Sequence, residues 1–325
     1  MKTLFKVLLV LAVLLAASGV GGYFYARQAF APPANQLTVS GLPATSTFVW
    51  QGDSMVTPAR PHAVLLVPVQ LAGCRRTCYL QFDTGAPYTV FYANPLAALR
   101  AAYPATQNAL LPQHDTLRAV RFGLGNAQVS VAKAPVLRYG ATTLPTDSTA
   151  PFVIGSLGAD VLVNQALVID FPRQRFSLYS QLPDSLTQRA QFTKLSFDNR
   201  RVLVQATVEN DQQNYLFDSG SSAFSLLTSQ AKWEKLATPA ATPTVSGVNS
   251  WGKTLNAHTV ASAAALHIGT QALPLHSVTY IDNVSFWQRA LMQVSGMGGM
   301  LGNEAFTQHT VLLDAQGGRF GIVQP

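Results

Sequence analysis

The sequence predicts a mostly β protein in which one β unit occurs twice. Short runs rich in β-branched and aromatic residues recur along the chain, bounded by Gly, Pro, Asn and Asp. Few stretches are long enough to form an amphipathic helix. Landmarks of the first half of the chain also return in the same order in the second half, which is the signature of an internal repeat.

The composition describes a globular chain with a sizeable core. Of the 325 residues, 48% are hydrophobic and 11% are charged, against ~25% charged in an average soluble chain. At roughly 150 residues per domain, this length suggests two domains. The net charge is +7, but no run of basic residues exceeds two, as at Arg75-Arg76 and Arg200-Arg201. Nucleic-acid binding needs a clustered basic stripe, so we expect no nucleic-acid partner.

Residues 1–37 are predicted to be a membrane anchor or signal segment followed by a linker. Lys2 and Lys6 precede an uncharged stretch over residues 7–26, close to the ~20 residues that a transmembrane helix needs. An uncleaved anchor is favoured over a cleaved signal peptide, whose cleavage site would lie near residues 16–18. In both cases we expect the remainder outside the cytoplasm, tethered in the cell envelope or secreted.

Two cysteines lie four residues apart at the predicted tip of a hairpin. In the oxidising compartment that the first segment implies, Cys74 and Cys78 are expected to form a disulfide that staples the turn. Two cysteines exclude a zinc site of four thiolates, and the six histidines show no metal-ligand spacing. We therefore expect no metal and no cofactor.

The repeat is seen in pairs of equivalent residues. Gly220, which ends NYLFDSG, lies 135 residues after Gly85, which ends YLQFDTG. Four later pairs are each separated by 144 residues: Gly125 and Gly269, Gly158 and Gly302, Asp170 and Asp314, and Arg175 and Arg319. The second copy therefore contains an insertion of nine residues. We assign residues 38–180 and 192–325 to two lobes and residues 181–191 to their linker.

Each copy is predicted to contain a short helix and a hairpin turn. Asn94-Pro95 and Thr228 precede helix-forming runs and have the residue types of helix starts. Asp170 and Asp314 are each followed five positions later by an arginine. The spacing indicates a hairpin turn closed by an Asp–Arg pair in both copies.

One aspartate ends an apolar strand in each copy. Asp83 follows Phe82, and Asp218 follows Phe217. A carboxylate placed there is poorly solvated, and its burial costs free energy unless hydrogen bonds or a partner compensate. A hydroxyl residue and then a glycine follow each aspartate, namely Thr84 and Gly85 in the first copy and Ser219 and Gly220 in the second. The glycine lets another chain segment approach closely.

The segments FDTGAPYTVFY and FDSGSSAFSLL, each followed later by SLG or MLG, resemble the aspartic proteases of the pepsin and retropepsin type. The retropepsin-like domains of bacterial envelope proteins, here in tandem, are similar over about 285 of the 325 residues. The resemblance implies a bilobal fold in which the two Asp loops meet on a pseudo-twofold axis. Ser156-Leu157-Gly158 and Met300-Leu301-Gly302 would cross behind them, and Ser156 departs from the apolar residue usual there.

The resemblance also implies a chemistry. Asp83 and Asp218 would share a proton, because two carboxylates in near contact cannot both ionise in a site of low dielectric. One would act as the general base on a water molecule, while the other would donate to the carbonyl oxygen. Residues 84, 85, 219 and 220 would position them. The expected function is that of an aspartic endopeptidase acting on polypeptides, and we expect a monomer.

Two features depart from the pepsin pattern. Ala86-Pro87 follows the first motif, as in retropepsins, and the first copy has no obvious flap hairpin with a tyrosine at its tip. The second copy carries its nine extra residues within VSGVNSWGKTLNAHTV, which makes Trp251 the candidate to cover the site.

Two alternatives to an enzyme stay open at this point. The first is a non-catalytic envelope protein that binds peptides between the lobes of an acid-protease fold. The second is a pair of independent half-sites, which predicts separated lobes and a dimer.

Overall fold

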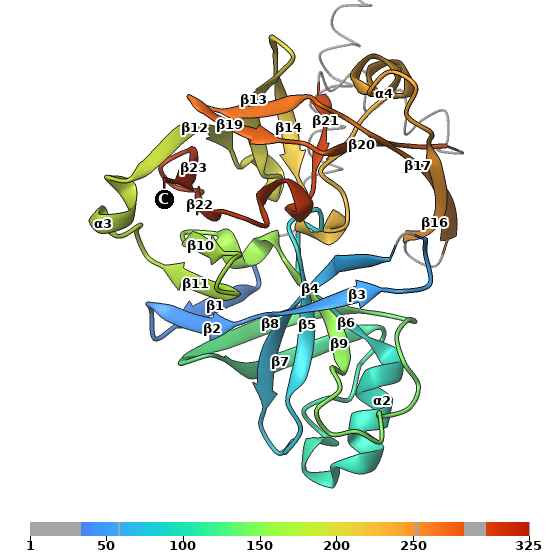
Figure 1. Cartoon of the computed structure of the whole chain (residues 1–325). Coiled ribbons are helices and arrows are strands. Elements are labelled where there is room, and N and C mark those ends of the chain that lie inside the picture. Colours follow the sequence, from blue (N-terminus) through green and yellow to red (C-terminus); the bar gives the residue numbers. More distant parts are fainter. Residues whose placement is uncertain (1–33, 58, 251–252, 283–296, 325) are drawn as a thin grey trace, which may run out of the picture. The chain divides into compact units, whose positions relative to one another are not determined.

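The computed structural model describes residues 34–57, 59–250, 253–282 and 297–324. Residues Asn35–Pro325 form one compact unit, and two sheets dominate its described part (Figure 1). One sheet has eight strands and the other has fifteen. The mostly β fold class is therefore confirmed.

Eleven strands form the first half: β1 (Leu37–Ser40), β2 (Ala44–Thr47), β3 (Val49–Asp53), β4 (Arg60–Leu71), β5 (Cys78–Asp83), β6 (Val90–Tyr92), β7 (Thr116–Leu124), β8 (Ala127–Leu137), β9 (Val153–Gly158), β10 (Ala166–Asp170) and β11 (Arg175–Tyr179). The second half contains β12 (Ala190–Ser196), β13 (Leu203–Val208), β14 (Asp211–Phe217), β15 (Leu226–Leu227), β16 (Thr244–Ser250), β17 (Lys253–Ala261), β18 (Ala265–Ile268), β19 (Gln271–Pro274), β20 (Ser277–Ile281), β21 (Met297–Leu301), β22 (Thr310–Asp314) and β23 (Arg319–Val323). The α-helices within the described residues are α2 (Ala93–Ala102), α3 (Asp184–Thr187) and α4 (Gln230–Leu236).

The strand pairings of the first half recur in the second. β5 pairs antiparallel with β4 and parallel with β9, and β14 pairs in the same two ways with β13 and β21. Both parallel pairs contain a register shift, between Tyr79 and Leu80 in one and between Asn214 and Tyr215 in the other. These positions are 135 residues apart, like the two glycines after the aspartates. The repeat in the sequence is therefore also a repeat in strand register.

The same apolar packing supports both aspartate strands. In β5 every second side chain is buried, as period-two patterning requires of a strand covered on one face. Phe82 packs edge-on against Phe176 at a centroid distance of 5.0 Å. The repeat equivalents Phe217 and Phe320 are 5.6 Å apart. A buried aromatic pair thus lies under the end of each strand, where it holds the position of the next residue.

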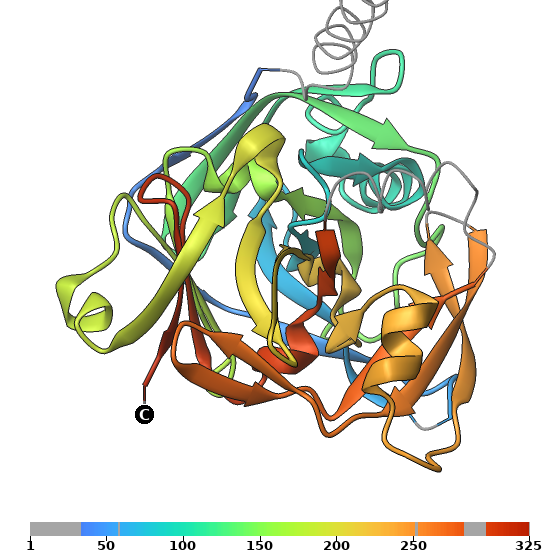
Figure 2. The ribbon, with the colours of Figure 1, turned by 90° about the horizontal axis from the view of Figure 1, so that it is seen from above.

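A run of six strands joins the halves, in the order β12-β23-β22-β10-β11-β2 (Figure 1). In its centre β10 pairs antiparallel with β22, and Val168 lies opposite Leu312. These two residues are repeat equivalents, 144 positions apart, so a local pseudo-twofold axis passes between them. Seen from above, β14 and β21 lie near the middle of the unit, and the β16–β17 hairpin lies at its edge (Figure 2).

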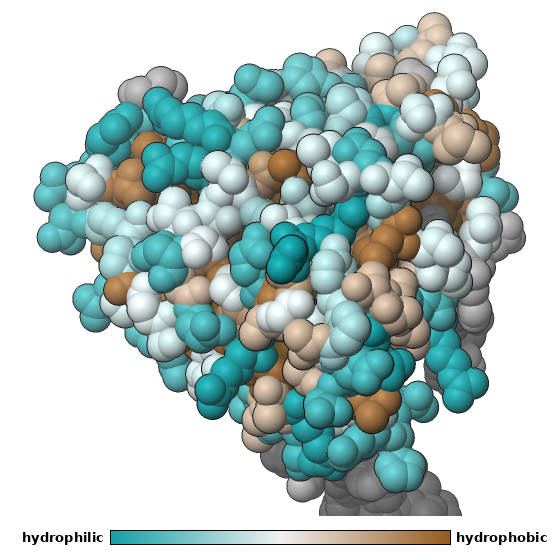
Figure 3. Space-filling model, turned by 90° about the horizontal axis from the view of Figure 1, so that it is seen from below, coloured by the Kyte–Doolittle hydropathy of each residue, from teal (hydrophilic) through white to brown (hydrophobic). Residues whose placement is uncertain are grey.

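No helix within the described residues is long and apolar enough to cross a membrane. The predicted anchor falls on residues 1–33, which lie outside the described part of the chain. On the face seen from below, hydrophilic side chains are interspersed with smaller hydrophobic areas (Figure 3). This mixture is ordinary for a protein surface in water.

The predicted disulfide is wrong for this structure, because Cys74 and Cys78 are free thiols. Both are buried in the turn between β4 and β5. Each thiol donates to the carbonyl oxygen of Arg76, with Sγ–O distances of 3.3 and 3.9 Å. Burial raises the pKa of Cys78, which keeps that thiol protonated. Thiol–carbonyl hydrogen bonds thus close the turn in place of a covalent bond.

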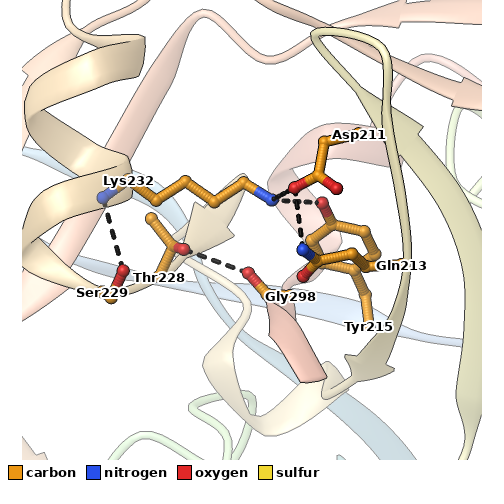
Figure 4. Close-up of polar contacts among 7 residues, drawn as sticks. All are labelled: Asp211, Gln213, Tyr215, Thr228, Ser229, Lys232 and Gly298. Carbon is orange, nitrogen blue, oxygen red and sulfur yellow. Dashed lines mark hydrogen bonds and ion pairs between the residues drawn. The ribbon is translucent and has the colours of Figure 1, made fainter. Parts of the chain in front are cut away.

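The start of the second helix differs from the prediction by one residue. Ser229, not Thr228, is the N-cap of α4, and its hydroxyl accepts from the backbone N–H of Lys232 at 3.3 Å. Thr228 instead donates to the carbonyl oxygen of Gly298 at 3.0 Å (Figure 4). The hydroxyl of Thr228 therefore ties the chain before α4 to β21.

The same helix is fixed to β14 by a polar network (Figure 4). The ammonium of Lys232 donates to the hydroxyl of Tyr215 at 2.8 Å and to a carboxylate oxygen of Asp211 at 3.2 Å. Gln213 donates to the same oxygen at 2.8 Å. Because Asp211, Gln213 and Tyr215 all belong to β14, α4 is anchored to the strand that leads into Asp218.

Only one of the two predicted Asp–Arg pairs forms as expected. Asp314 accepts from Arg319 at 2.9 Å, whereas Asp170 accepts from the guanidinium of Arg173 at 3.0 Å. Both aspartates also cap the turn, since each accepts the backbone N–H three residues later. The residue three positions after Asp314 is Gly317, which has no side chain. Arg319, two positions further on, therefore pairs with the carboxylate of Asp314.

Candidate active site

Asp83 is the last residue of β5, and Asp218 directly follows β14. Each lies where a parallel pair of strands ends. Asp83 pairs with Gly158 of β9, and the N–H of Asp218 donates to the carbonyl oxygen of Leu301 in β21 at 2.8 Å. The strand register therefore fixes both aspartate backbones from behind.

Four reciprocal hydrogen bonds join the two aspartate loops. The N–H of Thr84 donates to Ser219 Oγ, and the N–H of Ser219 donates to Thr84 Oγ1, both at 2.9 Å. Thr84 Oγ1 donates to the carbonyl oxygen of Phe217 at 2.6 Å, and Ser219 Oγ donates to that of Phe82 at 3.0 Å. Thr84 and Ser219 are buried. Each hydroxyl both accepts and donates across the junction, which explains why hydroxyl residues stand there.

Glycine at positions 85 and 220 is required by the opposite aspartate. A Cβ on Gly85 would lie 2.6 Å from Oδ1 of Asp218, and one on Gly220 would lie 2.5 Å from Oδ1 of Asp83. These distances are far inside van der Waals contact. The loops therefore approach so closely that each packs its glycine against the carboxyl group of the other half.

The two carboxyl groups are in hydrogen-bonding contact. Burial, followed by the negative charge of Asp218, raises the pKa of Asp83 to about 7. Burial also raises the pKa of Asp218, whose residue is 8% exposed. Two carboxylates this close titrate as a pair, so one proton is shared between them around neutral pH. The two carboxyl groups that touch belong to one chain. This contact disagrees with the alternative of two independent half-sites, which predicts separated lobes.

Both carboxyl groups also accept hydrogen bonds from their own loops. Oδ1 of Asp83 accepts the N–H of Gly85 at 3.0 Å and that of Ala86 at 3.1 Å. Asp218 accepts the N–H of Gly220 on Oδ1 and the hydroxyl of Ser221 on Oδ2, both at 2.9 Å. The loops thus hold the carboxyl groups in orientation by fixed dipoles. Ser221 is therefore a hydrogen-bonding partner within its own loop.

The segments that cross behind the loops are in close contact with them. A Cβ on Gly158 would lie 2.4 Å from the carbonyl carbon of Tyr88, and one on Gly302 would lie 2.1 Å from the carbonyl oxygen of Ser221. Ser156, the polar departure in the first segment, forms a hydrogen bond of 2.8 Å with the hydroxyl of Tyr92. Ser156 therefore pairs with a tyrosine that the second copy lacks.

The nine extra residues of the second copy fall in the segment that forms the β16–β17 hairpin. Trp251, the predicted cover of the site, lies outside the described residues. The first half contributes Arg60, which donates to Ser246 of the hairpin at 2.8 Å. The same guanidinium lies 4.6 Å from the ring centroid of Phe224, in the loop after Asp218. The hairpin is thus attached to the first half beside one aspartate loop.

Sequence reasoning missed two buried polar residues that support these loops. Asn303 donates to the carbonyl oxygen of Ser219 at 3.2 Å and to the hydroxyl of Ser222 at 2.7 Å. Asp160 accepts from the backbone N–H and the hydroxyl of Thr89, both at 2.8 Å. Asp160 and Asn303 lie just after Gly158 and Gly302, the glycines of the crossing segments. A polar residue shortly after this glycine in both copies is the sequence feature that could have indicated them.

The described residues contain no group of three or more His, Cys, Asp or Glu side chains that could hold a metal ion. The chemistry this site offers is that of two adjacent carboxyl groups, one able to accept a proton and the other able to donate one.

Comparison with known proteins gives likenesses to solved structures. The chain is similar to the crystal structure of an aspartic proteinase from Irpex lacteus, with 11% sequence identity and a TM-score of 0.48. The match covers 88% of this chain and 97% of that chain. No family model matches the sequence, and no curated protein matches it.

Proposed function

We propose that this protein is an aspartic endopeptidase with a two-lobed acid-protease fold. The observation that carries the proposal is the hydrogen-bonding contact between the Asp83 and Asp218 carboxyl groups, one from each half of the repeat. The reciprocal bonds of Thr84 and Ser219 and the two glycines support it, because they hold the carboxyl groups together. Preorganised groups of this kind need little rearrangement during a reaction.

The proposed reaction proceeds without a covalent intermediate. The ionised carboxyl group takes a proton from a water molecule while the water oxygen attacks the peptide carbonyl carbon. The protonated carboxyl group gives its proton to the carbonyl oxygen, which produces a neutral tetrahedral diol. The C–N bond then breaks as the nitrogen receives a proton from one carboxyl group, while a hydroxyl group of the diol gives its proton to the other carboxyl group and becomes the carbonyl oxygen of the product. The products are a carboxylic acid and an amine, and the dyad returns to its singly protonated form.

The pH dependence of cleavage tests this proposal. Incubating the protein with a diverse peptide pool at a series of pH values, and identifying new termini by mass spectrometry, gives the profile. We expect cleavage in the acidic range that declines as pH rises through about 7, where Asp83 loses the shared proton. Activity that instead increases between neutral and alkaline pH would contradict the mechanism. Peptides retained on the protein without cleavage at any pH would favour the non-catalytic binding protein.

We also propose that the protein works outside the cytoplasm. The support is the uncharged segment over residues 7–26 with lysines before it. Fractionation of cells followed by N-terminal sequencing is the measurement. We expect the protein in the envelope fraction with its first residues intact, or in the exported fraction with a new N-terminus. Recovery of the intact chain in the cytoplasmic fraction would exclude both.

A further inference from the structure

Among the side chains of the two aspartate loops, one hydroxyl group donates to the carboxyl group of its own loop, and it belongs to the second loop. Oδ1 of Asp83 accepts the N–H groups of Gly85 and Ala86, and Oδ1 of Asp218 accepts that of Gly220. The third residue after Asp218 is Ser221, whose hydroxyl donates to Oδ2 of that aspartate at 2.9 Å. The equivalent residue after Asp83 is Ala86, whose methyl group donates nothing. The two loops can therefore be compared with each other, since one has a hydroxyl donor at this position and the other does not.

We propose that Ser221 places the negative charge of the dyad on Asp218 and leaves the shared proton on Asp83. For its catalytic meaning this inference rests on the proposed function. Asp218 is then the base that takes the proton of the attacking water, and Asp83 is the acid that protonates the carbonyl oxygen. Ser221 is a positioning residue that acts through Asp218.

The physical reason is the strength of hydrogen bonds to an ionised acceptor. An O–H donor stabilises a carboxylate much more than a neutral carboxyl group. Asp218 is 8% exposed, so little water is available to replace this donor. The hydroxyl of Ser221 also lies 3.3 Å from the sulfur of Met300. A thioether is a weak acceptor, and the single hydrogen of the hydroxyl is directed to the carboxylate.

Burial, the largest cause of both raised pKa values, acts against this assignment because Asp218 is buried and Asp83 is only partly buried, whereas the pairing of the two carboxyl groups acts in its favour. The hydrogen bond between the carboxyl groups raises the pKa of Asp83 and lowers that of Asp218, which is the same direction. Burial, and to a smaller extent the charge of Asp83, raises the pKa of Tyr92 from its ordinary value of 10.0, so Tyr92 is neutral in the range where the dyad titrates. Its hydroxyl is hydrogen-bonded to Ser156. The guanidinium of Arg200 donates to the carbonyl oxygen of Pro87, in the loop after Asp83, at 3.2 Å.

The test is a titration that needs no substrate. Aspartate carboxyl carbons are labelled with carbon-13 in the full chain, and the signals of the dyad are assigned by their loss in Asp83→Asn and Asp218→Asn. In the unaltered protein we expect Asp218 to ionise at lower pH than Asp83. Ser221→Ala should raise the pKa of Asp218 by about 1 or more, since it removes a charge-assisted hydrogen bond. Ser221→Thr keeps the hydroxyl and should leave the titration unchanged.

A swap variant gives the sharpest result. With Ala86→Ser and Ser221→Ala together, the donor moves to the other loop, and we expect Asp83 to ionise first. The assignment is overturned if Asp83 ionises first in the unaltered protein, or if neither Ser221→Ala nor the swap changes the order or the pKa values in a chain that is still folded. Failure of the proposed function is a separate outcome. It would appear as an absence of peptide cleavage while the carboxyl titrations behave as expected.

Discussion

Replacing either aspartate by asparagine is expected to reduce peptide cleavage by at least about 100-fold, within the ~10²–10⁴ range of general acid–base catalysis. Asp83→Asn leaves an amide that cannot give a proton to the carbonyl oxygen, and Asp218→Asn leaves one that cannot accept a proton from water. An amide nearly matches a protonated carboxyl group in size, and each variant removes one of two adjacent acids. We therefore expect the folded structure to persist, as measured by circular dichroism and urea unfolding.

Asp184→Asn is the matched control. Asp184 is exposed at the start of α3, far along the chain from both loops, and its replacement should leave the cleavage rate unchanged. If Asp83→Asn and Asp218→Asn retained the full rate on a purified peptide substrate, the dyad would not be the catalyst and the activity would have to come from another site.

Thr84→Val is expected to lower the free energy of unfolding by about 2–6 kcal/mol, at ~1–3 kcal/mol for each of the two buried backbone groups left without a partner. Valine has nearly the shape of threonine, so it leaves no cavity. It removes the acceptor of the Ser219 N–H and the donor to the Phe217 carbonyl oxygen. Both groups lie at the junction of the loops, next to the buried side chains of Thr84 and Ser219. Urea unfolding measures the loss.

Two further variants make this prediction specific. Thr84→Ser keeps the hydroxyl and should recover most of the stability. Thr270→Val removes a hydroxyl that is exposed, though bonded to Gln191 at 3.0 Å, and should change stability by no more than about 0.5 kcal/mol. Equal stability of Thr84→Val and the unaltered protein would show that the reciprocal hydrogen bonds do not hold the loops together.

The repeat is the part of the fold that the amino-acid order predicts best. Separations of 135 and 144 residues between a few glycines, aspartates and arginines return as equivalent strand registers in β5–β9 and β14–β21. This is possible because a strand's register follows from its alternation of apolar residues and from its turns, which are both local. Val168 and Leu312 are also 144 positions apart and lie opposite each other in β10 and β22. No local pattern indicated that these two strands would pair.

The errors share a cause. Cys74 and Cys78 have the spacing of a stapled turn, yet the position of the Arg76 carbonyl oxygen decides what their thiols contact. Thr228 and Ser229 are both good N-caps, and the approach of Gly298 from a distant strand selects between them. In each case the residue type offers several hydrogen bonds, and the fold decides which partner is in reach.

The sequence by itself determined the β class, the duplication, and the two aspartates with their hydroxyl and glycine neighbours, because these depend on composition, periodicity and order along the chain. Only the tertiary structure decided that Asp83 and Asp218 touch, that each glycine faces the opposite carboxyl group, and that the hydroxyl of Ser221 donates to the carboxyl group of Asp218. The contacts between the loops join residues more than 130 positions apart. Whether residues so far apart along the chain come into contact depends on how the two halves pack together, which the sequence of either half alone does not determine.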